Sequence, residues 1–289
     1  PKIRAAAAAA ILHFENGPVN HAESILNEML DSEDESTQAT ALNRLVHNDS
    51  ILPQEKLIQF LCNASVLISN VALSIAEKRN DSKLIPAIIS NLNLPKTSIQ
   101  ARLTLNKFSS ELVVEEFQKL LTSIDITRKL RLGIIRTLRE YPNDQTIDLL
   151  LGQLDREDQD IYNEVVESLL AVARAHGIGE EKMKKIEEEI QAISKKVYTL
   201  NEAIKLIPND DNKFLMHDHL NNEIQNTLPT LLKLGVLDVP DTPIETYIHT
   251  VKSGDLAKLP FLLEFFENIF SIEEREVINP LIESISLEE

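Results

Sequence analysis

The sequence predicts an all-α protein built as an α-solenoid, a stack of antiparallel helix pairs. The first observation is a repeat, because apolar residues recur at a step of about 31 through most of the first 177 residues. The second is composition: seven Gly and twelve Pro are spread over 289 residues, so few positions demand a tight turn. Apolar residues make up 43% of the chain without any Trp, so Leu, Ile and Val supply the core. In such a stack each pair buries its core against its neighbours.

Two columns of residues define the repeat. In steps of 31, the first column runs back from Val165 through Ile134, Leu103, Ala72 and Ala41. The second column lies four positions earlier in each helix and holds Ile161, Leu130, Ile99, Ile68 and Thr37. One further step, lengthened to 34, reaches Ala7 and Ile3. We therefore expect the columns to share one continuous apolar core.

The columns place five complete helix pairs. Residues 1–10 are expected to form the second helix of a repeat that begins upstream of Pro1. First helices are then expected around 25–30, 57–61, 84–92, 119–124 and 147–154, and second helices around 41–46, 71–73, 103–108, 130–134 and 161–170. The fourth first helix is a misfit, because Lys119 and Ser123 occupy core columns. A one-residue slip that brings Leu120 and Ile124 to the core would correct it.

Beyond residue 177 the pattern changes, which divides the chain into residues 1–177 and 178–289. Gly177 and Gly179 predict a helix stop and a hinge. A heptad seam from Met183 to Ile207 then predicts one long helix that ends before Pro208, about 28 residues or 42 Å. We expect it to pack on the helix that follows, around 214–231, although pairing with a second copy is the alternative. Short paired helices are expected over 242–287.

Charge and cysteine content bound the partners and the compartment. The formal net charge is −17, which opposes nucleic acid and anionic lipid and favours a protein partner. The single cysteine, Cys62, allows no disulfide within the chain, as suits a reducing cytoplasm. No run of eighteen apolar residues predicts direct membrane insertion. No glycine-rich phosphate loop is present, so no nucleotide cofactor is expected.

The stretch 128–139 departs from this acidic background, with five Lys or Arg and no acid in twelve residues. One interpretation is structural, with Arg131 paired to an aspartate of a neighbouring turn. The other is a contact site for an acidic partner. We predict a non-catalytic scaffold for protein interaction whose inner surface is lined by the second helices. The candidate contacts there are Asn43, Arg44, Asn106, Arg136 and Arg139.

Two family resemblances extend this prediction. Pro1-Lys2-Ile3-Arg4, followed by small residues, resembles the second helix of a HEAT repeat, and the 31-residue period is closest to the short HEAT-like repeats of bacterial phycobilisome-lyase-type proteins. The segments 259–268 and 278–282 are similar to helical regions that follow the membrane part of bacterial ATP/ADP-translocase-like transporters. These resemblances imply a soluble fragment of a larger bacterial protein, such as a cytosolic part of a transporter-like membrane protein, whose partner is another protein or another domain of the same parent chain.

The competing function is a helical metal-dependent hydrolase. His217-Asp218-His219 is the densest group of possible metal ligands, and His176 could join it as in phosphohydrolases of the HD type. Residues two apart on a helix point about 200° away from each other, so His217 and His219 cannot bind the same ion. This alternative therefore rests on His217 and Asp218.

Overall fold

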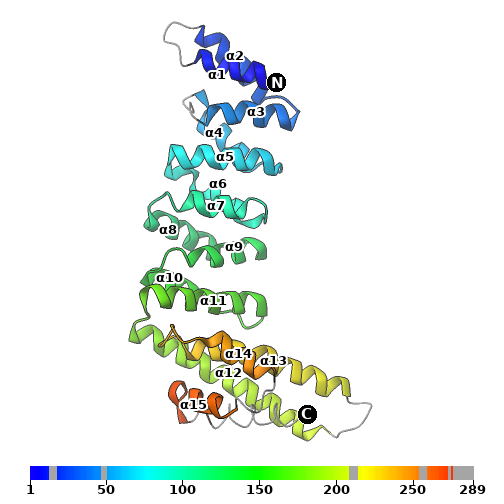
Figure 1. Ribbon diagram of the computed structural model, residues 1–289, viewed down its shortest axis with the longest axis vertical. Coiled ribbons are helices and arrows are strands. Elements are labelled where there is room, and N and C mark those ends of the chain that lie inside the picture. The colour runs from blue at the N-terminus through cyan, green and yellow to red at the C-terminus, as the bar shows by residue number, and fades with distance from the viewer. Residues whose placement is uncertain (13–17, 47–50, 208–213, 254–258, 273–274, 276–289) are drawn as a thin grey trace. The chain divides into compact units, whose positions relative to one another are not determined.

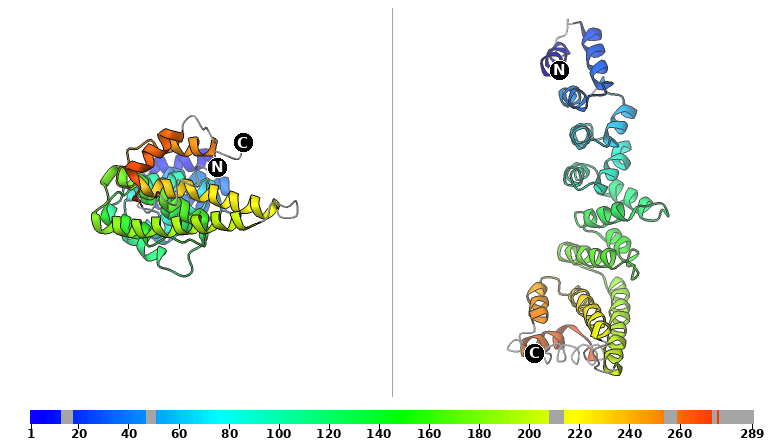
Figure 2. Two further views of the ribbon diagram at one scale, coloured as in Figure 1. Left: turned by 90° about the horizontal axis from the view of Figure 1, so that it is seen from below. Right: turned by 90° about the vertical axis from the view of Figure 1, so that its right-hand side faces the viewer.

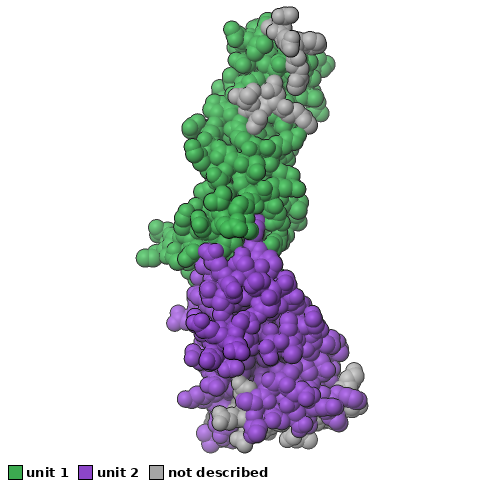
Figure 3. Space-filling model, turned by 90° about the vertical axis from the view of Figure 1, so that its left-hand side faces the viewer, with its two compact units in different colours: residues 1–140 green, residues 141–289 purple. Residues whose placement is uncertain are grey.

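The computed structural model describes residues 1–12, 18–46, 51–207, 214–253, 259–272 and 275. Fifteen α-helices and short 3-10 helices form the regular structure of these ranges, which contain no β-strand. The all-α prediction is confirmed. None of the helices in these ranges combines the length and the apolar character needed to cross a membrane. The chain divides into two compact units, residues 1–140 (unit 1) and 141–289 (unit 2) (Figure 3). The predicted division at residue 177 falls inside unit 2.

Unit 1 contains nine of the α-helices (Figure 1). They are α1 (Lys2–Ile11), α2 (Val19–Leu30), α3 (Glu35–Leu45), α4 (Gln54–Leu61), α5 (Val66–Arg79), α6 (Ile85–Ser90), α7 (Ser98–Leu105), α8 (Ser110–Leu121) and α9 (Arg128–Leu138). Two 3-10 helices, η2 (Ser82–Leu84) and η3 (Asn91–Asn93), flank α6.

The helices of unit 1 form two layers (Figures 1 and 2). In one layer α3 packs on α1, α5 on α3 and α7 on α5, and in the other α6 lies between α4 and α8. Successive helices join the layers, since α2 packs on α3, α4 on α5, α6 on α7 and α8 on α9. Between the layers lie fully buried side chains such as Leu42, Leu57, Leu73 and Ile88.

The predicted core columns hold in α5 and, for Ile134, in α9, where Leu130 is only half-buried, but they are wrong in α7. Ile68, Ala72 and Ile134 are buried, whereas the side chains of Ile99 and Leu103 are 62% and 52% exposed. In their place α7 and the residue before it bury Thr97, Ala101, Thr104 and Leu105. The step from Ala72 to Ala101 is 29 residues, and the step from Ala101 to Ile134 is 33.

A short turn explains this shift of two residues. The step from Leu57 to Ala72 in the α4/α5 pair is 15 residues, but the step from Ile88 to Ala101 in the α6/α7 pair is 13. The register is restored in the α8/α9 pair, where Phe117 and Ile134 lie 17 apart. Because the shortening and the lengthening cancel, the average period stays at 31.

Two other predictions are also wrong, and the same shift explains the first of them. In α8 the core residues are Val113, Val114, Phe117 and Leu121, and Ile124 is fully exposed, so the predicted one-residue slip is wrong. Lys119 is exposed, as its misfit to the core column indicated. In α1 the buried residues are Ala5 and Ala8 instead of the predicted Ala7 and Ile3, because the helix presents a different face to its neighbours.

Unit 2 begins with α10 (Asp144–Leu151) and α11 (Gln159–His176), which pack on each other. The remaining helices are α12 (Glu180–Leu206), α13 (Phe214–Gly235), α14 (Ile244–Ser253) and α15 (Leu259–Ile269). The long helix predicted from the heptad seam is confirmed as α12, 27 residues in length. It packs on α13 within the chain, as expected. The seam residues Ile186, Ile190, Ile193 and Val197 of α12 are buried, and so are Ile224, Leu228 and Leu231 of α13.

The helix stop predicted at Gly177 is also confirmed. Gly177 follows the last residue of α11 with φ of +80°, a backbone conformation that side chains with a Cβ rarely adopt. By contrast, nothing in the pattern anticipated that α13 continues through Pro229, which lies inside the helix.

Aromatic contacts and one buried cation fasten the last helices of unit 2. Tyr247 of α14 stacks on Phe265 of α15, with the ring centroids 3.7 Å apart. Lys233 of α13 lies between Glu167 of α11 and Glu245 of α14. Burial lowers the pKa of Lys233, but its hydrogen bonds to the two carboxylates outweigh burial and hold the pKa above its ordinary value. The apolar residues predicted for a last helix, 277–285, lie outside the described residues.

Candidate functional site

A groove in unit 1 is the best candidate for a functional site, and we call it the α7/α9 groove. Its volume is about 410 Å³. One wall is formed by η3, the following turn and α7, and the other by α9. The lining residues are Leu92, Asn93, Pro95, Ser98, Ile99, Arg102, Lys129, Leu132, Gly133, Arg136 and Thr137. Apolar and basic side chains therefore share one concave surface.

The absence of a side chain at Gly133 brings the two walls together. A Cβ atom at this position would lie 2.7 Å from the backbone oxygen of Leu92, which is closer than such atoms approach, and 3.0 Å from the Cβ of Leu92, which is a tight contact. Only glycine lets α9 lie this near to η3. The short turn before α7 is the second feature that shapes the groove, because it places Ile99 in the groove instead of the core.

The groove is positively charged on an acidic chain. Arg102, Lys129 and Arg136 line it. Residues 98–140 carry eight Lys or Arg against five Asp or Glu, whereas the whole chain carries 29 against 46. The net charge of this segment is therefore positive, opposite in sign to the net charge of the chain.

One carboxylate of the chain itself lies at this basic surface. The side chain of Glu140 accepts a hydrogen bond from the amide of Asn106 and lies 3.5 Å from Arg102, measured from Oε1 to Nη1. The contact residue predicted at Asn106 is therefore already engaged with Glu140. This arrangement shows how the end of α7 holds a carboxylate.

The five candidate contacts lie on or directly after three helices of unit 1, α3, α7 and α9. Arg136 lines the α7/α9 groove, and Arg139 follows α9 directly. Asn43 and Arg44 are exposed near the end of α3, and they do not line the groove. Sequence reasoning missed Arg102, Lys129 and Ile99. Lys129 lay within the basic stretch already noted, but Ile99 had been assigned to the core.

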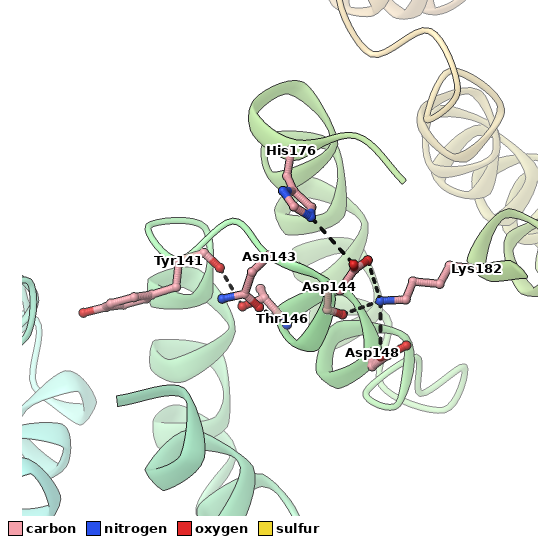
Figure 4. A network of polar contacts seen from close by, with 7 residues as sticks. All are labelled: Tyr141, Asn143, Asp144, Thr146, Asp148, His176 and Lys182. Atoms are coloured by element: carbon pink, nitrogen blue, oxygen red, sulfur yellow. Dashed lines mark hydrogen bonds and ion pairs between the residues drawn. The ribbon is translucent and has the colours of Figure 1, made fainter. Parts of the chain in front are cut away.

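A second polar cluster lies in unit 2 and joins α12 to α10 (Figure 4). Lys182 Nζ lies 2.9 Å from Asp144 Oδ1 and 3.2 Å from Asp148 Oδ2, and it also donates to the backbone oxygen of Asp144. His176 Nε2 lies 4.0 Å from Asp144 Oδ2. Both acids are therefore satisfied by Lys182, so we interpret the cluster as a structural link across the turn at Gly177.

This link predicts a pH dependence of stability for unit 2. The hydrogen bond from Lys182, followed by its charge, lowers the pKa of Asp144 below its ordinary value of 3.8. A carboxyl group whose pKa is lowered by folding stabilises the fold at pH values above its ordinary pKa. This contribution is lost as the pH falls through the lowered pKa. We expect Asp144→Asn to reduce the melting temperature at pH 7 and to cause a smaller reduction as the pH falls below 3.8. Thermal melts followed by circular dichroism across this pH range measure the change, and a loss that does not vary with pH would contradict the prediction.

The residues of the alternative metal site do not converge. His217 Nε2 lies 3.2 Å from the backbone oxygen of Ile207, and His176 lies beside Asp144 and Lys182 instead of joining it. Over the described ranges no group of three or more His, Cys, Asp or Glu side chains is arranged to hold a metal ion. The single cysteine, Cys62, is exposed after the last residue of α4.

A small cavity of about 80 Å³ lies between α11, α12 and α13 in unit 2. The hydroxyl of Tyr162 donates to Glu189 Oε2 over 3.2 Å, and Arg156 lies 2.9 Å from the same oxygen. Burial, followed by the charge of Glu189, raises the pKa of Tyr162 well above its ordinary value. These polar groups already have partners, and the cavity is far below the roughly 300 Å³ typical of ligand sites.

No protein-family model matches this chain, and no curated protein matches it either. The α7/α9 groove must therefore be interpreted from its own geometry and charge.

Proposed function

We propose that this protein is a non-catalytic scaffold, an α-solenoid of HEAT-like antiparallel helix pairs that holds another protein or another domain of its own parent chain in the cytoplasm. The observation that carries the proposal is the α7/α9 groove, which combines exposed apolar side chains with three basic ones. Such a surface suits recognition of a protein segment.

The packing of unit 1 supports the solenoid part of the proposal. In a solenoid each repeat contacts only its neighbours, and here α5 packs on α3, α4 and α7. Four of the five candidate contacts, namely Arg44, Asn43, Arg136 and Arg139, lie on or directly after α3 and α9, which are second helices of their pairs. A solenoid presents such helices side by side as one surface for a partner.

Affinity capture tests the scaffold proposal. The full chain is used as bait in an extract of the source organism, in parallel with the double variant Arg136→Glu/Arg139→Glu. We expect the wild type to retain a stoichiometric protein partner, and we expect recovery with the variant to fall at least about tenfold, because two basic groups are replaced by acids. Lys119→Glu on α8 is the matched charge control. Equal recovery with both baits would remove the basic surface from the proposal.

Metal analysis separates the scaffold from the hydrolase built on His217 and Asp218. A metal-dependent hydrolase requires a bound transition metal, whereas a scaffold does not. A stoichiometric metal in the purified protein that is lost in His217→Ala would favour the hydrolase and overturn the proposal.

A further inference from the structure

We propose that the α7/α9 groove binds an amphipathic helix of a partner protein whose apolar stripe is flanked by Asp and Glu. This inference rests on the scaffold function and names the chemistry of the partner. Three features of unit 1 carry it: an exposed apolar stripe on α7, a closed floor beneath it, and basic side chains on both walls.

The apolar stripe consists of Ile99, which lines the groove, and Leu103, which is exposed on the same helix but does not line it. These residues are four apart on α7, so their side chains lie one above the other on the same face. They are 62% and 52% exposed. The corresponding positions of α5, 29 residues earlier, hold the polar residues Asn70 and Ser74. Packing of the unit therefore does not require apolar residues at this place, and their exposure marks a surface that a partner can cover.

The floor of the groove explains why a helix fits. Leu92 of η3 meets the backbone of α9 at Gly133, so the two walls are closed at their base and open above it. Two exposed side chains at i and i+4 present a ridge, and the apolar stripe of a second helix packs on such a ridge. Helix-in-groove recognition uses apolar anchors with this spacing. A volume of about 410 Å³ gives room for the anchor side chains, not for a whole domain.

The basic side chains of the groove favour acidic residues on both sides of the apolar stripe of the bound helix. Arg102 comes from the wall formed by α7, and Lys129 and Arg136 come from α9. Glu140 shows that Arg102 and Asn106 hold a carboxylate at this surface. Acidic residues beside the apolar stripe would form ion pairs of the same kind. A nucleic acid would meet these cations too, but the net charge of −17 opposes a polyanion as a whole, and an apolar stripe gives phosphates no contact.

Labelled peptides of about 18 residues test the inference with the full chain. The first peptide has Leu along one helical face with Glu on both flanks. The second has the same composition with its Leu residues scattered around the helix, and the third has Lys in place of Glu. We expect fluorescence anisotropy to show at least about tenfold tighter binding of the first peptide than of either reference, because only it matches both the stripe and the charges. Raising the salt concentration should weaken this binding.

Surface variants locate the site. We expect Ile99→Ser/Leu103→Ser and, separately, Arg136→Glu to weaken binding of the first peptide about tenfold. Leu112→Ser on α8 is the matched apolar control, since Leu112 is also exposed, and Lys119→Glu is the charge control. Circular dichroism confirms that each variant is folded. Equal binding of the three peptides, or binding unaffected by both groove variants, would overturn the inference.

The outcomes distinguish this inference from the scaffold function. If affinity capture retains a partner but the groove variants bind it normally, the scaffold proposal survives through another surface and the inference fails. If the acidic peptide binds in the groove while no cellular partner is retained, the groove chemistry stands and the scaffold proposal fails.

Discussion

Replacing Phe117 with Ala should lower the free energy of unfolding of unit 1 by about 3–5 kcal/mol, the range observed when a buried aromatic side chain is truncated. Phe117 lies in α8 and is fully buried, and it is one of the two largest fully buried side chains of the described residues. Together with Val113 and Leu121, it forms the core face of α8, whose position in the sequence follows from the two-residue shift. Its removal leaves a cavity that the neighbouring helices cannot close without moving.

Urea unfolding of the purified protein, followed by circular dichroism, measures this loss. Leu112→Ala is the matched control, because Leu112 lies on the same helix but is 42% exposed, and we expect its change to stay below about 1 kcal/mol. Phe117→Leu should fall between the two, since it removes fewer buried atoms. Equal losses for Phe117→Ala and Leu112→Ala would contradict the assignment of the core face of α8.

Replacing Gly133 with Val should cost unit 1 about 3 kcal/mol, the upper part of the range for overpacking a close contact. The added Cβ would lie 2.7 Å from the backbone oxygen of Leu92, and backbone atoms cannot turn aside as a flexible side chain does. Helix propensity works in the opposite direction, because a residue with a side chain favours the helix over Gly by up to about 1 kcal/mol. The steric cost is larger, so α9 must move away from η3.

Gly152→Ala is the control for the steric cost, since Gly152 directly follows the last residue of α10 and has room for a Cβ atom. A Cβ at Gly152 would meet its nearest atoms at 3.4 and 3.5 Å, which is ordinary contact, so we expect no loss of stability there. The variant Gly133→Val should also weaken peptide binding in the α7/α9 groove, because the walls of the groove separate. If Gly133→Val proved as stable as the wild type, the close approach of α9 to Leu92 would be wrong.

The sequence predicted the elements of this fold better than their register. The seam from Met183 to Ile207 identified α12 because one unbroken heptad pattern involves no turn whose length could vary. Gly177 identified the end of α11 because its requirement for positive φ is local. The columns through Leu103 failed because a turn shortened by two residues between α6 and α7 is compensated between α8 and α9. The average spacing over several repeats does not reveal a shortened turn and a lengthened turn that cancel. The only indication in the sequence was Lys119, a charged residue in a predicted core column.

Only part of the candidate site was predicted from the sequence, and the error in register is one reason. The run of basic residues gave Arg136, which the structure places in the α7/α9 groove. Ile99 could not be recognised as a surface residue while it was counted as part of the core. Arg102 lies in a different helix from the basic run, and only the packing of both α7 and α9 on η3 brings them to one surface. That association depends on Gly133, and a glycine within a helix does not reveal which backbone it approaches.

The succession of helices in unit 1 also has a mechanical consequence. A tensile load on this unit passes from one helix junction to the next, like a load on springs in series, so every junction bears the same force and the weakest yields first. Of the α-helices of unit 1, α1 buries the fewest side chains, only those of Ala5 and Ala8, so it loses the least buried apolar surface when it is pulled away. Stretching should therefore peel α1 away while the helices around the groove remain assembled.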